Sequence, residues 1–327
     1  MHCSPDAYDQ VRSTPSISKR ISCGPAALAS WPILYHGLAP VTPTEGLKPL
    51  AILLRAGLFI LIAALGYFLV FPLLFGLAGT PVLVNATLGT FATAAVANAV
   101  ALRIWARGRL ADIGLGWTGP SRRNFALGIL GGIGSALFVI LLPVAARGAD
   151  IEPAPNQHFA LPSLLLVSII LLFGAAGEEM LFRGYAFQLL VKAIGPFATI
   201  LPVATLFGLA HSANSYFTWL ALVNTILWGI LFGYAFLISG DLWLPLGLHF
   251  GWNWTLPLLG VNLSGFTMGI TGYSVEWKVG DLWSGGAYGP EGGLLTSAVV
   301  IGLFFYVQKA PVQHQEAYLL REASADA

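Results

Sequence analysis

Long, continuous apolar runs follow one another along the chain from residue 50 onward. A helix needs about 20 apolar residues to cross the hydrocarbon core of a bilayer, whereas the strands of a membrane barrel are shorter and alternate between apolar and polar positions. None of these runs alternates in that way. The pattern therefore predicts an all-α, polytopic transmembrane helical bundle with about eight spans, at residues 50–77, 82–103, 125–146, 162–191, 196–212, 216–239, 242–262 and 291–309.

Polar segments flank the apolar runs and predict the organisation of the chain. Residues 1–49 are rich in Pro, Ser and charge and have no apolar signal-peptide segment near the start, so we expect a disordered cytoplasmic leader. We expect residues 50–310 to form the transmembrane domain and residues 311–327 a polar tail. The loop at 263–290 is rich in Gly and aromatic residues, which favours an ordered external cap or lid, with a plain connecting loop as the alternative.

The composition supports an integral membrane protein. Hydrophobic residues make up 56% of the chain and charged residues 9%, against about a quarter charged in soluble domains, and the mean hydropathy is +0.76. The net charge of +1 comes without a basic patch, so we expect no nucleic-acid partner. Both cysteines, Cys3 and Cys23, lie in the leader, so any metal site would need His and Glu ligands.

The charges in the loops predict the orientation of the chain, because cytoplasmic loops carry an excess of Lys and Arg. Basic residues gather in the leader, in the loop after the second run and near the far end, at Arg12, Lys19, Arg20, Lys48, Arg103, Arg107, Arg109, Arg122, Arg123, Lys309 and Arg321. The opposite loops are mainly acidic, with Asp150, Glu152, Glu276, Asp281 and Glu291 against Arg147 and Lys278. We therefore expect both termini in the cytoplasm.

Three charged residues interrupt the fourth apolar run, in the stretch "GEEMLFR". A charge at the centre of a bilayer costs a few kcal/mol or more, so such residues face a protein-lined or wet interior. Glu179 and Arg183 are four residues apart, in the order that favours an ion pair. Taken alone, this pair could be a buried structural ion pair with no part in catalysis. Glu178 points about 100° away from Glu179 around the helix. It therefore needs a partner from another helix, or it must be protonated by desolvation.

Two histidines and an asparagine in later runs lie at a depth similar to that of Glu178. With a rise of 1.5 Å per residue, Glu178 and His211 both lie roughly 20 Å from the turn that joins their two helices. His249 and Asn253 share one face of the seventh run, roughly 12 and 18 Å from its start. Each histidine alone could be a simple helix-packing hydrogen bonder, but the shared depth predicts that these residues converge.

The converging side chains suit the hydrolysis of a peptide bond by water. The sequence has no G-x-S-x-G, no Ser or Cys nucleophile beside a base and no H-E-x-x-H. A carboxylate beside a histidine can act as a general base on water, and a histidine with an asparagine amide can donate to an oxyanion. Alternatively, Glu178, His211 and His249 could bind a divalent metal such as zinc that activates the water. The residue types leave both mechanisms open.

The segments "EEMLFR", "FGLAH" and "HFGWN" resemble the motifs EExxxR, FxxxH and HxxxN of the CPBP (Abi) family, which comprises type II CAAX prenyl proteases and bacteriocin-processing enzymes. The resemblance covers about residues 160–260. It implies an intramembrane endopeptidase, of a kind long described as a metalloprotease, in which Glu178 is the catalytic base and His211 helps to hold the water. It also implies that His249 and Asn253 stabilise the oxyanion. Glu179 and Arg183 would shape the site, and Phe207 belongs to the second motif.

The resemblance also sets the functional expectations. We expect a multi-pass protein of a bacterial inner (plasma) membrane that cleaves a membrane-associated peptide or protein, which could be lipidated. The alternative is a non-catalytic immunity or scaffold protein that binds a peptide or a partner. A transporter with a proton-coupling glutamate is a third interpretation. The sequence shows no inverted repeat of the kind many transporter folds have, which argues against it.

Overall fold

The computed structural model describes residues 48–78, 82–156, 158–315 and 317–320. All of them belong to one compact unit, Ala39–Ala327, and the second unit, Met1–Leu38, lies outside the described residues. The predicted leader at 1–49 therefore falls almost entirely outside the described part of the chain. Within the predicted polar tail at 311–327, residues 316 and 321–327 also lie outside the described part of the chain.

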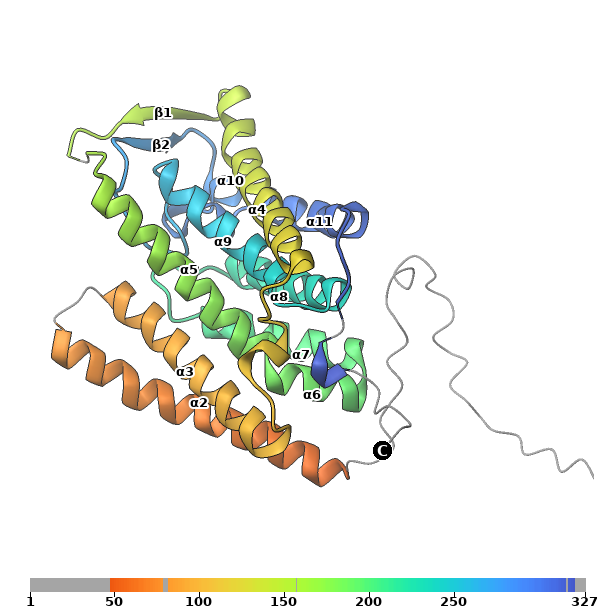
Figure 1. Cartoon of the computed structure of the whole chain (residues 1–327). Coiled ribbons are helices and arrows are strands. Elements are labelled where there is room, and N and C mark those ends of the chain that lie inside the picture. The colour runs from red at the N-terminus through yellow and green to blue at the C-terminus, as the bar shows by residue number, and fades with distance from the viewer. Residues whose placement is uncertain (1–47, 79–81, 157, 316, 321–327) are drawn as a thin grey trace, which may run out of the picture. The chain divides into compact units, whose positions relative to one another are not determined.

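The described residues form a helical bundle with one small two-stranded sheet (Figure 1). The long elements are α2 (Pro49–Ala78), α3 (Val82–Trp105), α4 (Gly119–Ala145), α5 (Leu161–Arg183), α6 (Tyr185–Ile194), α7 (Pro196–Ala210), α8 (Trp219–Ser239), α9 (Trp243–Leu258) and α11 (Leu294–Lys309). The remaining elements are β1 (Ala149–Pro153), β2 (Tyr273–Trp277), α10 (Asp281–Ser284) and the short 3-10 helices Leu110–Ile113, Gly286–Tyr288, Pro290–Gly292 and Tyr318–Leu320. The predicted all-α transmembrane fold class is confirmed.

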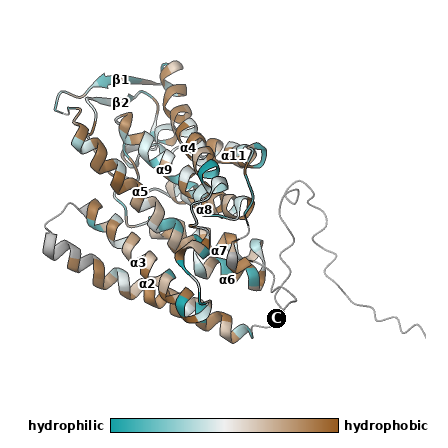
Figure 2. Cartoon of the chain, viewed as in Figure 1, coloured by the Kyte–Doolittle hydropathy of each residue, from teal (hydrophilic) through white to brown (hydrophobic). Residues whose placement is uncertain are grey.

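Among the described residues, five helical segments are long and apolar enough to cross a membrane, at Pro49–Val70, Leu83–Trp105, Gly119–Ala145, Leu161–Ile194 and Trp219–Ser239. Helices α7 and α11 are apolar but shorter. The predicted number of about eight spans therefore stays a prediction. Much of helix α2 consists of hydrophobic residues (Figure 2). Several of their side chains are exposed, among them Leu53 at 67% and Phe68 at 70%. Such a surface suits lipid rather than water.

Helices α4 and α9 pack backbone against backbone through glycines. A Cβ added at Gly132 would lie 2.3 Å from the carbonyl oxygen of Leu248, and one at Gly247 would lie 2.4 Å from that of Phe125. Small residues permit this close approach and increase the van der Waals contact between helices in a membrane. The contact fixes the position of α9, the helix that carries His249.

The fourth apolar run is not one continuous helix as the sequence predicted, because the chain breaks at Gly184 between α5 and α6. A Cβ at Gly184 would lie 2.2 Å from the carbonyl oxygen of Met180. Asn98 of α3 satisfies the backbone groups at the break: its amide donates to the Met180 carbonyl (2.9 Å) and its oxygen accepts from Tyr185 N–H (2.8 Å). A buried backbone group without a partner is costly, so Asn98 stabilises the break.

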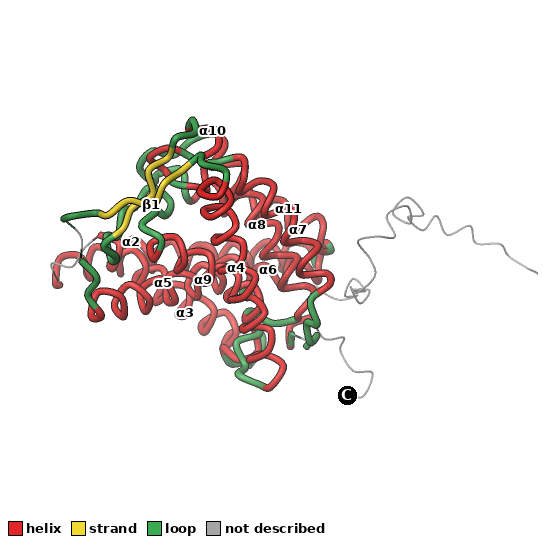
Figure 3. Tube along the Cα trace, turned by 90° about the horizontal axis from the view of Figure 1, so that it is seen from above, coloured by secondary structure: helices red, strands yellow, loops and turns green. Residues whose placement is uncertain are grey.

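The segment between α9 and α11 is ordered. Of the two expectations for residues 263–290, an ordered cap and a plain connecting loop, this agrees with the first. Its strand β2 pairs antiparallel with β1, which follows α4, and both strands lie at one end of the helices (Figures 1 and 3). An ion pair between Lys278 and Asp150 adds to this pairing. Residues far apart in the sequence thus form one cap of strands, short helices and turns.

The glycine contact between α4 and α9 can be tested with two alanine variants of the same helix. Gly132→Ala should destabilise the protein by about 1–3 kcal/mol, because the new methyl group overlaps the backbone of α9. Gly134→Ala is the matched control, since nothing lies within 4 Å of a Cβ added there. Thermal unfolding in detergent should show a lower midpoint for Gly132→Ala alone; equal midpoints for both variants would contradict this packing.

Candidate active site

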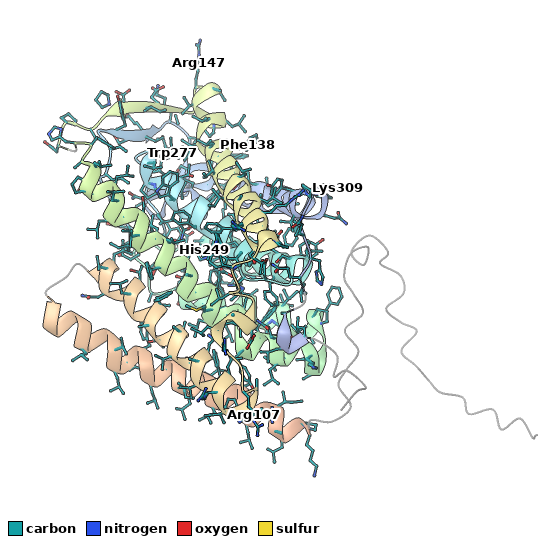
Figure 4. The ribbon with its side chains drawn as sticks, in the orientation of Figure 1. Arg107, Phe138, Arg147, His249, Trp277 and Lys309 are labelled. Carbon is teal, nitrogen blue, oxygen red and sulfur yellow. The ribbon has the colours of Figure 1, made fainter. Side chains whose placement is uncertain are left out.

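Three helices bring Glu178, His211 and His249 together in the interior. Glu178 lies near the end of α5, His211 follows the last residue of α7, and His249 lies in the middle of α9. The Nε2 atoms of His211 and His249 each lie 3.8 Å from the same oxygen of Glu178, Oε2. Figure 4 shows His249 inside the bundle, whereas Arg147 and Lys309 extend from its periphery. The structure thus brings together the three residues that the sequence had placed at a common depth.

A backbone hydrogen bond fixes the orientation and tautomer of His211. Its Nδ1 lies 2.8 Å from the carbonyl oxygen of Phe207, one turn earlier on α7. A carbonyl only accepts, so Nδ1 carries the proton and the Nε2 of the neutral ring is an acceptor facing Glu178. The ring of Phe207 also packs against that of His211, with centroids 4.7 Å apart. Phe207 therefore holds the histidine through both its backbone and its side chain.

His249 is held from the opposite side by the second glutamate of the pair. Its Nδ1 lies 2.9 Å from Glu179 Oε1, and its ring stacks on Phe232 with a centroid distance of 4.9 Å. A carboxylate that accepts from Nδ1–H favours the charged imidazolium. In that form the Nε2–H of His249 is a donor directed toward the region of Glu178.

Arg183 completes this buried chain of polar groups. Its Nη1 lies 3.4 Å from Glu179 Oε1, its Nη2 donates to the carbonyl of Gly229 on α8 (2.9 Å), and both charged side chains are at most 1% exposed. The guanidinium carbon also lies 4.8 Å from the ring centroid of Phe207. A cation over an aromatic face is stabilised by the ring quadrupole. Glu179 and Arg183 thus form the ion pair that their spacing favours.

A cavity of about 410 Å³ opens beside these groups. Glu178, His211, His249 and Asn253 all line it, so the four residues predicted to be catalytic share one cavity. Its lining includes residues of helices α2 and α3, namely Tyr67, Leu83, Ala86, Thr87 and Thr90. Residues of the segment between α9 and α11 also line it, namely Leu263, Ser264, Phe266, Met268 and Glu291. The space is large enough for a short stretch of peptide.

Glu291 also belongs to this cavity, which its place in a predicted external loop did not indicate. Its side chain is buried, at 9% exposure, and lines the cavity. Burial raises the pKa of Glu291, while hydrogen bonds from Ser264 and Trp252 oppose the rise. The signal available in the sequence was one acidic residue inside "GPEGG", directly before an apolar run.

Within the described residues, no group of three or more His, Cys, Asp and Glu side chains has the arrangement of a metal site. The alternative that Glu178, His211 and His249 bind zinc therefore stays a prediction.

The buried ion pair gives a prediction about folding. Arg183→Met should destabilise the protein by about 3–5 kcal/mol, because it leaves the buried charge of Glu179 without its partner. Adding Glu179→Gln to Arg183→Met should recover a large part of that loss, since the unpaired charge is then removed as well. Purification yield and the thermal midpoint in detergent measure both effects. A double variant no more stable than Arg183→Met would contradict a charge-pairing role for these two residues.

Residues 160–255 match the family model described as type II CAAX prenyl endopeptidase, Rce1-like. No curated protein and no solved structure matches the chain. The match supports a CAAX-type intramembrane protease in general, and together with the apolar helices it supports an integral membrane protein. The matched segment, residues 160–255, carries Glu178, His211, His249 and Asn253 and is similar to the Rce1-like type II CAAX prenyl endopeptidases.

Proposed function

We propose that the protein is an intramembrane endopeptidase in which Glu178 activates water to hydrolyse a peptide bond. The observation that carries the proposal is the position of Glu178 Oε2, 3.8 Å from the Nε2 atoms of both His211 and His249, at the wall of a cavity. This separation is too long for a direct hydrogen bond, and a water molecule between the groups can bridge it.

In the first step, the bridging water attacks the carbonyl carbon of the scissile peptide bond. Glu178 takes one proton of the water as general base. The acceptor Nε2 of neutral His211 receives a hydrogen bond from the other proton and orients the attacking lone pair. The products of this step are a tetrahedral intermediate with an oxyanion and a protonated Glu178.

In the second step, the intermediate collapses and the C–N bond breaks. Charged His249 donates from Nε2–H to the oxyanion, and Asn253, which lines the same cavity, supplies a second donor from its amide. Protonated Glu178 then returns its proton to the leaving nitrogen, which departs as an amine. The hydrolysis thus balances with one water consumed. Glu179 and Arg183 act through His249 by holding its orientation and charge.

The lining of the cavity supports a membrane-associated substrate. Apolar residues in its lining include Leu83, Ala86, Leu171, Phe266 and Met268. In a ligand pocket, apolar side chains bind the apolar parts of the ligand, and a small number of polar groups fix its orientation. We therefore propose a membrane-associated peptide or protein, with or without a lipid group, as the substrate class.

Removing the carboxylate of Glu178 tests the mechanism. With a panel of fluorogenic membrane-anchored peptides, Glu178→Gln should lower kcat by about 10²–10⁴-fold, the usual effect of a general base. His211→Ala should lower it as well. Glu276→Gln is the control, because Glu276 lies exposed on β2, apart from the cavity residues. Cleavage by Glu178→Gln at the wild-type rate would reject the role of Glu178.

The same assay separates the remaining alternatives. Cleavage that survives a strong chelator supports the glutamate mechanism, whereas activity that is lost with the chelator and restored by zinc would favour a metal bound by Glu178, His211 and His249. A non-catalytic binding protein predicts a different pattern. Its cellular function would survive both Glu178→Gln and His211→Ala.

A further inference from the structure

A tight turn at residues 263–266 forms one wall of the catalytic cavity. Leu263 and Phe266 exchange two backbone hydrogen bonds, of 2.9 and 2.8 Å, and both residues line the cavity. The two central residues, Ser264 and Gly265, have φ angles of 49° and 85°. Positive φ at both positions is typical of a type I′ turn, and it costs energy at the non-glycine Ser264. Other contacts must therefore hold Ser264 in this conformation.

The side chain of Glu291 provides those contacts. Its Oε2 accepts from the backbone N–H of Ser264 (2.5 Å) and from the Ser264 hydroxyl (2.7 Å). Its Oε1 accepts from the indole N–H of Trp252 (3.2 Å), which belongs to α9 and directly precedes Asn253. One buried carboxylate therefore joins the turn to the helix that carries His249 and Asn253.

The backbone of Glu291 is held independently of its side chain. Asn224 of α8 donates to the carbonyls of Glu291 (2.7 Å) and Gly293 (2.9 Å). Thr296 of α11 donates to the carbonyl of Pro290 (2.6 Å). A replacement of the Glu291 side chain therefore keeps these backbone hydrogen bonds. We expect it to change the conformation of the 263–266 turn instead.

We propose that Glu291 is a positioning residue for the reaction: it fixes the 263–266 turn against α9, so that Leu263 and Phe266 form the wall of a substrate subsite. The inference rests on the proposed function and extends it to the recognition of the residues that flank the scissile bond. Glu291 acts only through the turn. The subsite presents apolar side chains, so it takes an apolar side chain of the substrate.

The chemistry of the contact explains why a carboxylate is required. Glu291 faces three donors, and a carboxylate offers only acceptors, so all three can be bonded at once. A glutamine at this position would direct an NH₂ group at one of these donors and leave that donor buried without an acceptor. Hydrogen bonds to charged groups are also the stronger ones. Loss of this contact should release the strained turn while the bundle stays folded.

Hydrogen exchange tests the structural half of the inference without any substrate. In purified Glu291→Gln, backbone amides of residues 261–268 should exchange about ten-fold faster or more than in wild type, while amides of α9 stay protected. Ser264→Ala keeps the backbone bond and loses the hydroxyl bond, so it should give an intermediate increase. Glu276→Gln, an exposed acid on β2, should leave exchange of 261–268 unchanged. Unchanged exchange in Glu291→Gln would overturn the inference, and if this variant does not fold, Ser264→Ala decides in the same way.

Kinetics with the peptide panel tests the functional half. For Glu291→Gln, KM should rise by about ten-fold for the preferred peptide while kcat stays within about three-fold, and the preference between large and small apolar residues beside the scissile bond should weaken. A general loss of folding would lower the active fraction and kcat with KM unchanged. Unaltered KM and preference in Glu291→Gln, with cleavage still abolished by Glu178→Gln, would refute the role of Glu291 and leave the proposed function standing.

Discussion

The buried chain of charges from Arg183 through Glu179 to His249 is the interaction on which the site depends. Removing charged groups from water costs several kcal/mol per ion, and that cost is met only while every partner stays in place. Arg183 is bonded to α8 through Gly229, and Glu179 is bonded to α9 through His249. The three helices are therefore restricted to one relative arrangement, and this arrangement also sets the distance between His249 and Glu178.

The two carboxylates that line the cavity differ in the environment that the fold gives them. Glu291 is nearly fully buried and its oxygens accept hydrogen bonds from Ser264 and Trp252, so both oxygens are engaged within the protein. Glu178 is 28% exposed and faces two ring nitrogens at a distance that leaves room for water. The same functional group thus serves as a structural anchor in one position and suits proton transfer in the other.

Much of the architecture and of the site was predictable from local pattern. Apolar runs of sufficient length predicted the helices, and the spacing of Glu179 and Arg183 predicted their ion pair, because both depend on residues close in sequence. The break at Gly184 was not predictable in this way. It depends on Asn98, a residue of α3, which bonds the backbone groups that the break exposes. The place of Glu291 in the cavity was not predictable for the same reason, since its partners Ser264 and Trp252 are distant in the sequence.

The sequence by itself determined the class of fold and the apolar helical segments, and it predicted that Glu178, His211, His249 and Asn253 converge, because hydrophobic length and helical rise are properties of single segments. Only the tertiary structure decided which atoms of those residues meet, which way each histidine ring is turned, and that the segment after α9 lines the cavity. Those features depend on contacts between helices and on hydrogen bonds across long sequence separations. A pattern along one chain does not specify them.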